Sequence, residues 1–362
     1  MLRIGIVTLH CSYNFGSALQ AYALQTILRR MGYEAVIIDY RSVDFDHYRI
    51  FSLRHPSVTK ATLENISKLP AMLKRRQSFQ SFSDCYLKLT DETFHYENPG
   101  ALTSLQNTFD YFVCGSDQIW NLDMTGGVDD AFFLSFAGAK RRIAYAASLG
   151  HTSFRAENFD GALISSLLER FDYVSVREEE AVPIIQPLTT RDVKVVLDPT
   201  LLLGGDEYSS ILGMAPRGED YIFVYLLRNS PELIESAKSI SETADKRVLY
   251  VSEHNLPIPN SKNLFGVGPG DFVSLISNAK YVLTNSFHAM IFSILFHVPF
   301  RVFAADATAS RIRDLLGKLG VSELCSAEVC SEPITEPDWD LLDQRIAFLR
   351  EDSLRFLKEA LS

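Results

Sequence analysis

Short apolar runs alternate with segments of helical periodicity along this chain. Residues 4–9 (IGIVTL) are apolar almost throughout, which predicts a strand buried on both faces. Residues 17–31 carry apolar side chains at helical spacing and are followed by Gly32, a residue typical of helix ends. Residues 34–39 (EAVIID) predict a second strand. This strand, helix and strand form a βαβ unit, which implies a parallel sheet.

The same alternation continues in two series. Further strands are predicted at 110–114, 142–147, 173–176, 193–197, 221–227, 247–252, 280–284 and 299–303, and helices at about 231–243, 271–278, 287–296 and 310–319. The stretch 198–220 is rich in Gly, Pro and Asp, and we interpret it as a linker. The chain end, at about 338–362, predicts one amphipathic helix.

This pattern predicts an α/β protein of two Rossmann-like domains with parallel sheets. We assign 1–200 to the N-terminal domain and 201–337 to the C-terminal domain, with the last helix packing back on the first. The architecture is GT-B-like, with the active site in the cleft between the domains. Polar or small residues follow most of the strands, and ligands of such sheets bind outside the carboxyl ends of the strands.

Charge and cysteine content exclude several function classes. The formal net charge of -10 argues against general nucleic-acid binding, which needs a basic surface. The five cysteines are scattered and show no CxxC pair, so neither a disulfide framework nor a zinc site is expected, and no metal-ligand spacing is visible. No segment has the length of a membrane span or the pattern of a signal peptide, and we expect a cytoplasmic protein.

One region departs from the acidic average. Between Arg41 and Thr90 the chain has nine Lys or Arg residues and four acidic residues, on a segment that we expect to be a helical insertion. Two interpretations stay open. The segment is either a solvated helical surface, or a patch that faces the phosphates of a membrane or of a lipid-linked acceptor.

Two segments of the first series are candidates for binding. Asn14, Gly16 and Ser17 lie between the first strand and its helix, where free N–H groups favour an anion; a tight turn capped by Ser17 is the alternative. Residues 115–121 (GSDQIWN) follow a buried strand. Here Asp117 can act as a base, Trp120 can stack on a sugar, and Gln118 and Asn121 can bind hydroxyls. An Asx turn beside a core tryptophan is the alternative.

Cationic candidates lie at the ends of later strands. Arg177 follows a strand, and its guanidinium suits a carboxylate or phosphate; a surface pair with Glu178 is the alternative. Ser286 is a plausible helix N-cap, and His288 lies in the first turn of that helix beside free N–H groups, a position that favours a functional over a structural histidine. Arg311 begins another helix and is either an anion-binding residue or a surface charge.

Together, these segments resemble the polysaccharide pyruvyl transferase family. The resemblance lies in 14–25 (NFGSALQAYALQ), 113–121 (VCGSDQIWN), 145–150 (YAASLG), 175–178 (SVRE), 197–200 (LDPT) and 284–289 (TNSFHA), and runs from about residue 3 to residue 320. It implies a GT-B-like fold and transfer of a pyruvyl group from phosphoenolpyruvate to two hydroxyls of a saccharide, free or lipid-linked, to form a cyclic ketal. This reaction would belong to exopolysaccharide or cell-surface polysaccharide biosynthesis. The donor is a co-substrate, and no cofactor is implied.

The resemblance also suggests roles for individual residues. Arg177 matches an arginine that holds the donor, and His288 matches the histidine of the second-domain motif. Many members have Arg-Leu-His in that motif, whereas this chain has Ser286-Phe287-His288. We hypothesise that Arg311 supplies the missing cation. The alternatives are a GT-B glycosyltransferase that uses a nucleotide sugar and a saccharide-binding relative without catalysis.

Overall fold

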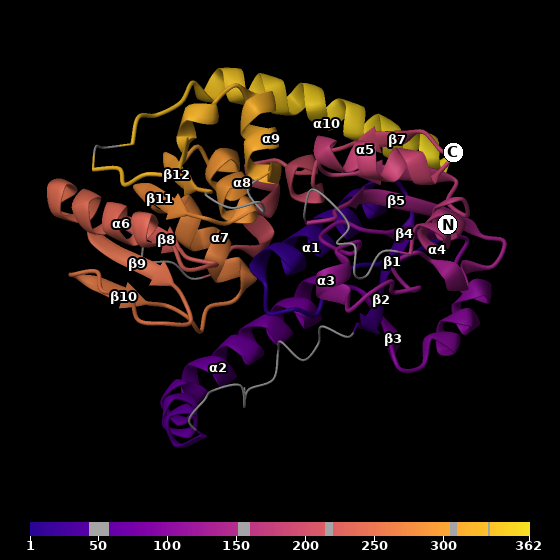
Figure 1. Cartoon of the computed structure of the whole chain (residues 1–362), viewed down its shortest axis with the longest axis horizontal. Coiled ribbons are helices and arrows are strands. Elements are labelled where there is room, and N and C mark those ends of the chain that lie inside the picture. The colour runs from indigo at the N-terminus through magenta and orange to yellow at the C-terminus, as the bar shows by residue number, and fades with distance from the viewer. Residues whose placement is uncertain (43–57, 151–159, 214–219, 305–309, 332–333) are drawn as a thin grey trace.

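The computed structural model describes residues 1–42, 58–150, 160–213, 220–304, 310–331 and 334–362 (Figure 1). It contains two sheets, both parallel throughout. The first has the order β3-β2-β1-β4-β5-β6-β7 and the second the order β10-β9-β8-β11-β12-β13. In each sheet the order reverses beside the first strand, as in the Rossmann fold, so the predicted α/β class is confirmed.

The strands of the first sheet are β1 (Arg3–Val7), β2 (Glu34–Arg41), β3 (Leu89–His95), β4 (Tyr111–Cys114), β5 (Arg141–Ala147), β6 (Tyr173–Val176) and β7 (Val193–Val195). Those of the second are β8 (Tyr221–Tyr225), β9 (Arg247–Val251), β10 (Ser261–Asn263), β11 (Tyr281–Thr284), β12 (Phe300–Phe303) and β13 (Cys325–Ser326). The central strands β1, β4, β5 and β8 are almost wholly buried, as their apolar sequences predict.

The helices are α1 (Phe15–Arg30), α2 (Val58–Tyr86), α3 (Leu122–Thr125), α4 (Gly161–Leu168), α5 (Val182–Ile185), α6 (Pro231–Ala244), α7 (Pro269–Ser277), α8 (Phe287–Leu295), α9 (Ser310–Leu319) and α10 (Trp339–Leu361). The helical insertion predicted within 41–90 is present as α2. The strands β3, β10 and β13 and the helices α3, α4 and α5 were not predicted. No helix within the described ranges is both long and apolar enough to cross a membrane.

Aromatic side chains join the two halves. The ring of Phe15, the first residue of α1, stacks on Phe272 of α7 with centroids 4.3 Å apart and an interplanar angle of 7°. Tyr225 at the end of β8 meets Phe15 edge-on, and Tyr208 packs against both Tyr22 of α1 and Phe292 of α8. One apolar core therefore runs from the helices of the first sheet into those of the second.

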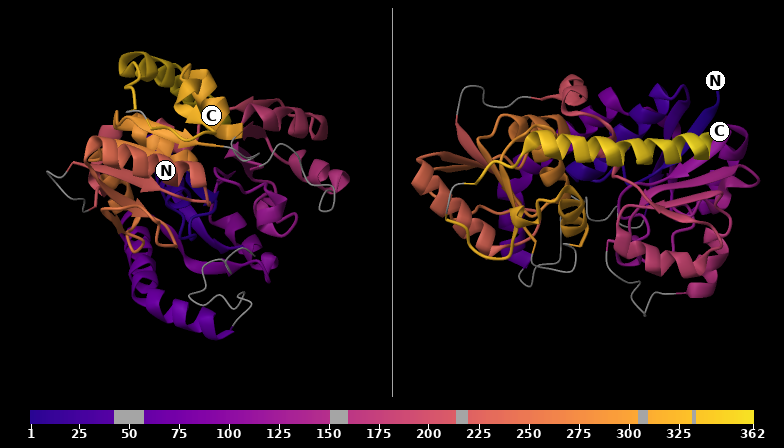
Figure 2. Two further views of the ribbon diagram at one scale, coloured as in Figure 1. Left: turned by 60° about the vertical axis from the view of Figure 1, so that its left-hand side comes forward. Right: turned by 90° about the horizontal axis from the view of Figure 1, so that it is seen from above.

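The helix α10 bridges the halves along one side of the molecule (Figure 2). At its end, Tyr33 donates a hydrogen bond to the carbonyl of Leu361, and Arg141 donates to the carbonyl of Ala360. Farther back along α10, the hydroxyl of Ser353 accepts from the backbone N–H of Leu197. The last helix thus contacts the first half.

The stretch 198–220 was wrongly interpreted as a linker over its first part. Residues 199–202 form a short 3₁₀ helix and are buried, and Asp198 before them is only 1% exposed. Arg350 of α10 donates to the carbonyls of Leu201 and Leu203. The Gly, Pro and Asp content reflects tight turns inside the core and not an exposed connection.

Candidate active site

The ends of four strands of the first sheet meet two helices of the second half. Asp117 follows β4, Ser148 follows β5, Arg177 follows β6 and Asp198 lies just beyond β7. The start of α1 approaches from the same sheet, and α8 and α9 approach from the other half. The polar side chains lie at the carboxyl edge of a parallel sheet, where ligands of such folds bind.

Asp198 connects both halves of the molecule. Its Oδ2 accepts from Arg177 Nη1 at 2.9 Å and from Ser116 Oγ at 3.3 Å, and its Oδ1 accepts from the hydroxyl and backbone N–H of Thr200. His288 Nε2 lies 3.5 Å from the same Oδ2. Burial by itself raises the pKa of Asp198, but the charges of His288 and Arg177 outweigh it and hold that pKa well below its usual range.

Arg177 is clamped between two carboxylates. Its Nε donates to Glu178 Oε1 at 3.1 Å, and its Nη1 donates to Asp198. Ser148 donates to the same oxygen of Glu178 at 2.6 Å. Burial opposes the charged form of Arg177, yet Glu178 and Asp198 outweigh it and raise the pKa of the guanidinium. Arg177 and Glu178 do form an ion pair. The alternative of a surface pair is nevertheless wrong, because both side chains are buried.

His288 packs against the start of α1. A Cβ atom added to Gly16 would fall 2.0 Å from His288 Nδ1, so only glycine permits this approach. Ser286 caps α8 by accepting from the backbone N–H of Ala289, as predicted. Asn14, and not Ser17, caps α1, since its Oδ1 accepts from the N–H groups of Gly16 and Ser17. Two helix N-termini thus converge on the imidazole.

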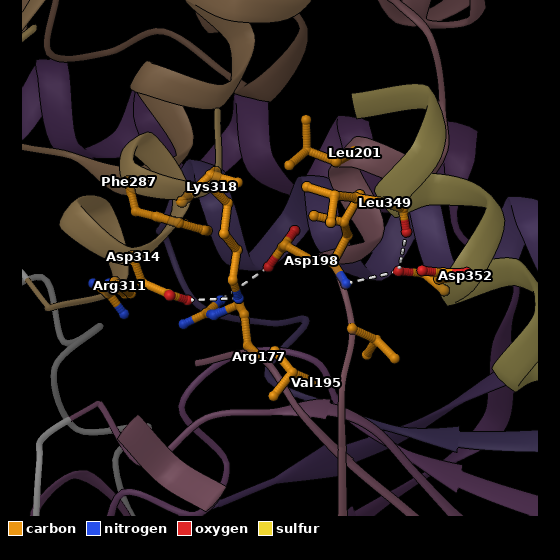
Figure 3. Close-up of a pocket in the computed structure, with 14 residues that line it drawn as sticks. Arg177, Val195, Asp198, Leu201, Phe287, Arg311, Asp314, Lys318, Leu349 and Asp352 are labelled. Carbon is orange, nitrogen blue, oxygen red and sulfur yellow. Dashed lines mark hydrogen bonds and ion pairs between the residues drawn. The ribbon is translucent and has the colours of Figure 1, made fainter. Parts of the chain in front are cut away.

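The guanidinium groups of two arginines lie near the ring of Phe287 (Figure 3). The guanidinium carbon of Arg177 lies 4.9 Å from the ring centroid, and that of Arg311 lies 5.6 Å from it. Burial lowers the pKa of Arg311 to about 10, and the charge of Arg177 acts in the same direction. Among the described residues, Arg311 has no carboxylate within ion-pair distance.

Four buried polar atoms at this junction have no hydrogen-bond partner among the described residues. They are Arg177 Nη2, Glu178 Oε2, Arg311 Nε and His288 Nε2, of which the last has only its 3.5 Å ion-pair contact with Asp198. Buried polar atoms are nearly always paired, and leaving one unpaired costs about 1–3 kcal/mol. Their convergence from both halves indicates a place prepared for a polar ligand.

Asp117 lies beside the same junction. Its Oδ2 accepts from Ser17 Oγ at 2.5 Å, and its Oδ1 accepts from the backbone N–H of Gln118. Asp117 also contributes to the electrostatic surroundings of both Arg177 and Arg311. The structure thus brings together Asn14, Gly16, Ser17, Asp117, Arg177, Ser286, His288 and Arg311, with their roles still to be tested.

The predicted acceptor residues do not join this group. Trp120 is 0% exposed, stacks on Phe133 with centroids 5.4 Å apart, and donates to the carbonyl of Phe132. We therefore correct the prediction that Trp120 stacks on a sugar, because its ring lies within the core. Asn121 donates to Gln118 at 2.7 Å and caps α3, so both amides stabilise their own turn.

Sequence reasoning missed Asp198, Glu178 and Phe287 as site residues. Each lay inside a quoted motif, but an acidic residue after a strand resembles any turn residue, and only the packed fold reveals that Asp198 meets groups from both halves. A cavity of about 70 Å³ adjoins Arg177, Asp198, Phe287, Arg311 and Lys318. No group of three or more His, Cys, Asp or Glu residues suited to a metal occurs in the described part of the chain.

A family model described as polysaccharide pyruvyl transferase matches residues 14–306 of this chain. No curated protein matches the sequence. Among solved structures, a UDP-N-acetylglucosamine 2-epimerase is similar at a TM-score of 0.55 and 13% identity, covering 100% of this chain and 95% of its own. A putative UDP-N-acetylglucosamine 2-epimerase from Listeria monocytogenes has a TM-score of 0.54 at 11% identity. The match covers 99% of this chain and 90% of the epimerase chain. At these identities the likeness establishes the GT-B-type fold alone.

Proposed function

The chain belongs to the polysaccharide pyruvyl transferase family, and on that premise we propose that it moves the pyruvyl group of phosphoenolpyruvate to two hydroxyls of a saccharide, forming a cyclic ketal. The main support is the set of unpaired buried polar atoms around Phe287. Phosphoenolpyruvate carries a carboxylate and a phosphate, so its site needs fixed donors that face inward. Arg177 Nη2 and Arg311 Nε are such donors.

The two arginines differ in how their charge is balanced. Arg177 is already paired with Glu178 and Asp198, so we propose that it orients the donor through its remaining N–H groups. Arg311 has no such carboxylate among the described residues and gains most from an arriving anion. It is our candidate for the cation that Ser286 does not provide. The N-termini of α1 and α8 add partial positive charge at the same junction.

The reaction requires proton transfer at a carbon and at oxygens. The methylene carbon of the donor takes a proton, and the adjacent carbon forms two bonds to saccharide oxygens and loses its bond to phosphate. The two hydroxyl protons end as the third methyl hydrogen and as the proton of the released hydrogen phosphate. We propose His288 as the group that moves protons, oriented by Asp198, with Asp117 as a second base.

Phosphate release tests this proposal. The protein is incubated with phosphoenolpyruvate and a panel of free and lipid-linked oligosaccharides, and products are analysed by mass spectrometry for the ketal. We expect acceptor-dependent phosphate release and a rise in melting temperature with phosphoenolpyruvate alone. Stabilisation by nucleotide sugars with transfer of a glycosyl group would identify a glycosyltransferase instead. Saccharide binding without turnover of either donor would identify a non-catalytic relative.

A further inference from the structure

A basic groove lies beside the junction, between α2 and the second sheet. Two adjoining pockets of about 590 and 500 Å³ form it, and both include Glu253 and Phe265. Its basic lining residues are Lys68, Lys74 and Arg75 of α2, together with Arg228 and Lys262 from the second half. Among the residues that the structure describes, Glu253 is the one acidic residue that lines these pockets. In a chain of formal net charge -10, this is a marked local excess of positive charge.

The groove also has the location and size of a ligand site. Its 500 Å³ part lies at the carboxyl ends of β8 and β9, beyond Tyr225 and Val251. Ligand pockets commonly measure about 300–1,000 Å³, whereas the cavity at Arg311 measures about 70 Å³. The junction thus offers room for a small group, and the groove offers room for a larger one.

Hydrogen bonds connect the groove to the junction. Asn285, directly before the cap of α8, accepts from the N–H of Leu227 at 2.8 Å and donates to the carbonyl of Arg228 at 2.7 Å. Both partners line the groove. The charge of Arg228 also reaches the junction, where it helps to lower the pKa of Arg311 after burial and Arg177.

Arg75 makes the second connection. It donates to the carbonyl of Phe265 at 3.0 Å and to that of Tyr13 at 2.6 Å, and its guanidinium carbon lies 4.8 Å from the centre of the Phe15 ring. Phe15 is the first residue of α1, next to Gly16. Arg75 and Asn285 thus connect the lining of the groove to the N-termini of α1 and α8, which approach His288.

We propose that this groove binds the diphosphate of a sugar diphosphate, so that the attached saccharide reaches the junction as acceptor. The proposal rests on the pyruvyl-transfer function. Lysines on opposite sides of the groove repel each other, and a ligand with several negative charges bound between them reduces this repulsion. The exposed side chains of Asn229, Glu253 and Asn255 supply hydrogen-bonding groups for sugar hydroxyls.

Neutralising one lysine on each side tests the groove. The variant K74Q/K262Q is compared with K140Q/K358Q, which removes the same charge elsewhere. Inorganic diphosphate, farnesyl diphosphate and UDP are titrated calorimetrically into each full-length protein. We expect diphosphate affinity to fall about tenfold or more in K74Q/K262Q and to stay unchanged in the control. Tighter binding of farnesyl diphosphate than of UDP would indicate a lipid-linked acceptor, and the reverse order a nucleotide-linked one.

Other outcomes overturn the proposal. Equal diphosphate affinity in the two double variants would remove the groove as the site. Competition between diphosphate and phosphoenolpyruvate would make the groove the donor site, since we expect the two to bind together. Loss of binding to phosphatidylserine vesicles in K74Q/K262Q, with no diphosphate binding by wild type, would assign the groove to a membrane surface.

The diphosphate titrations and the phosphate-release assay together test the groove and the pyruvyl transfer independently. Diphosphate binding without phosphate release from phosphoenolpyruvate would retain the groove and reject the transfer. Phosphate release with free saccharides by a protein that binds no diphosphate would do the opposite.

Discussion

Two buried aspartates in this molecule have the same kinds of partner and different surroundings. Asp198 meets Arg177 and His288, and Asp39 at the end of β2 meets Arg41 and His10. In both cases positive charges outweigh burial and hold the pKa of the aspartate below its usual range. Residue types alone would therefore mark both clusters as candidate sites.

The hydrogen bonds of the Asp39 cluster are complete. His10 Nε2 lies 2.9 Å from Asp39 Oδ1, and its Nδ1 lies 3.2 Å from the carbonyl of Thr8. Both ring nitrogens therefore lie within hydrogen-bond distance of an oxygen. Thr93 donates to Asp39 Oδ2 at 2.8 Å. No side chain of this cluster has a buried unpaired polar atom, in contrast to the junction.

The two clusters also differ in what they connect. The partners of Asp39 come from β2, β3 and the loop after β1, all within the first half of the molecule. Asp198 joins the first half to α8 of the second. A polar network that is complete within one sheet stabilises that sheet, whereas unpaired atoms shared between two halves indicate a ligand.

Replacing each histidine by alanine gives the largest expected contrast. His288→Ala should lower the rate of phosphate release about 10²–10⁴-fold, the usual contribution of a general acid or base, with little change in melting temperature. His10→Ala should destabilise the protein by about 1–3 kcal/mol and leave the rate per folded molecule unchanged. Phosphate release and thermal melts measure both. Near-normal activity of His288→Ala, or an equal loss in His10→Ala, would remove the distinction.

Arg311→Gln tests the unpaired atoms themselves. The KM for phosphoenolpyruvate should rise about 10- to 100-fold, as expected for loss of one charged hydrogen bond. Stability should stay equal or rise, because the variant removes a buried cation whose pKa is lowered to about 10. Arg313→Gln, at an exposed position in the same helix, is the control. An unchanged KM together with a lower melting temperature would make Arg311 a structural residue.

Apolar periodicity predicted the central strands and most of the helices. Strands buried on both faces have continuous apolar runs, and helices buried on one face have apolar residues at helical spacing. The strand β3 (LTDETFH) was missed because it lies at the sheet edge and exposes three consecutive residues. The strands β10 and β13 also lie at edges and have three and two residues. Edge strands obtain their hydrogen bonds from one neighbour and need no apolar run.

The structure brings together candidates whose residue type and strand end coincided, such as Arg177 and His288. Site prediction failed for Trp120, since an indole after a strand has the same sequence context whether it faces a cleft or the core. It also missed Asp198, whose partners Arg177 and His288 are far away in sequence. Such contacts depend on how the two halves pack, which local patterns do not encode.

The smallest expected effect concerns the Asp39 cluster and is seen in the pH dependence of stability. Asp39→Asn removes the negative charge but keeps the shape, and should cost about 1–2 kcal/mol at pH 7. Because the folded pKa of Asp39 is depressed, its contribution is fully present above the unfolded pKa of about 3.9 and is lost as pH falls through the folded value. The stability difference from wild type should therefore be present at pH 5 and shrink below about pH 4. Urea unfolding across this range measures it, and a difference that persists undiminished at pH 3 would show that the carboxylate charge of Asp39 does not stabilise the first sheet.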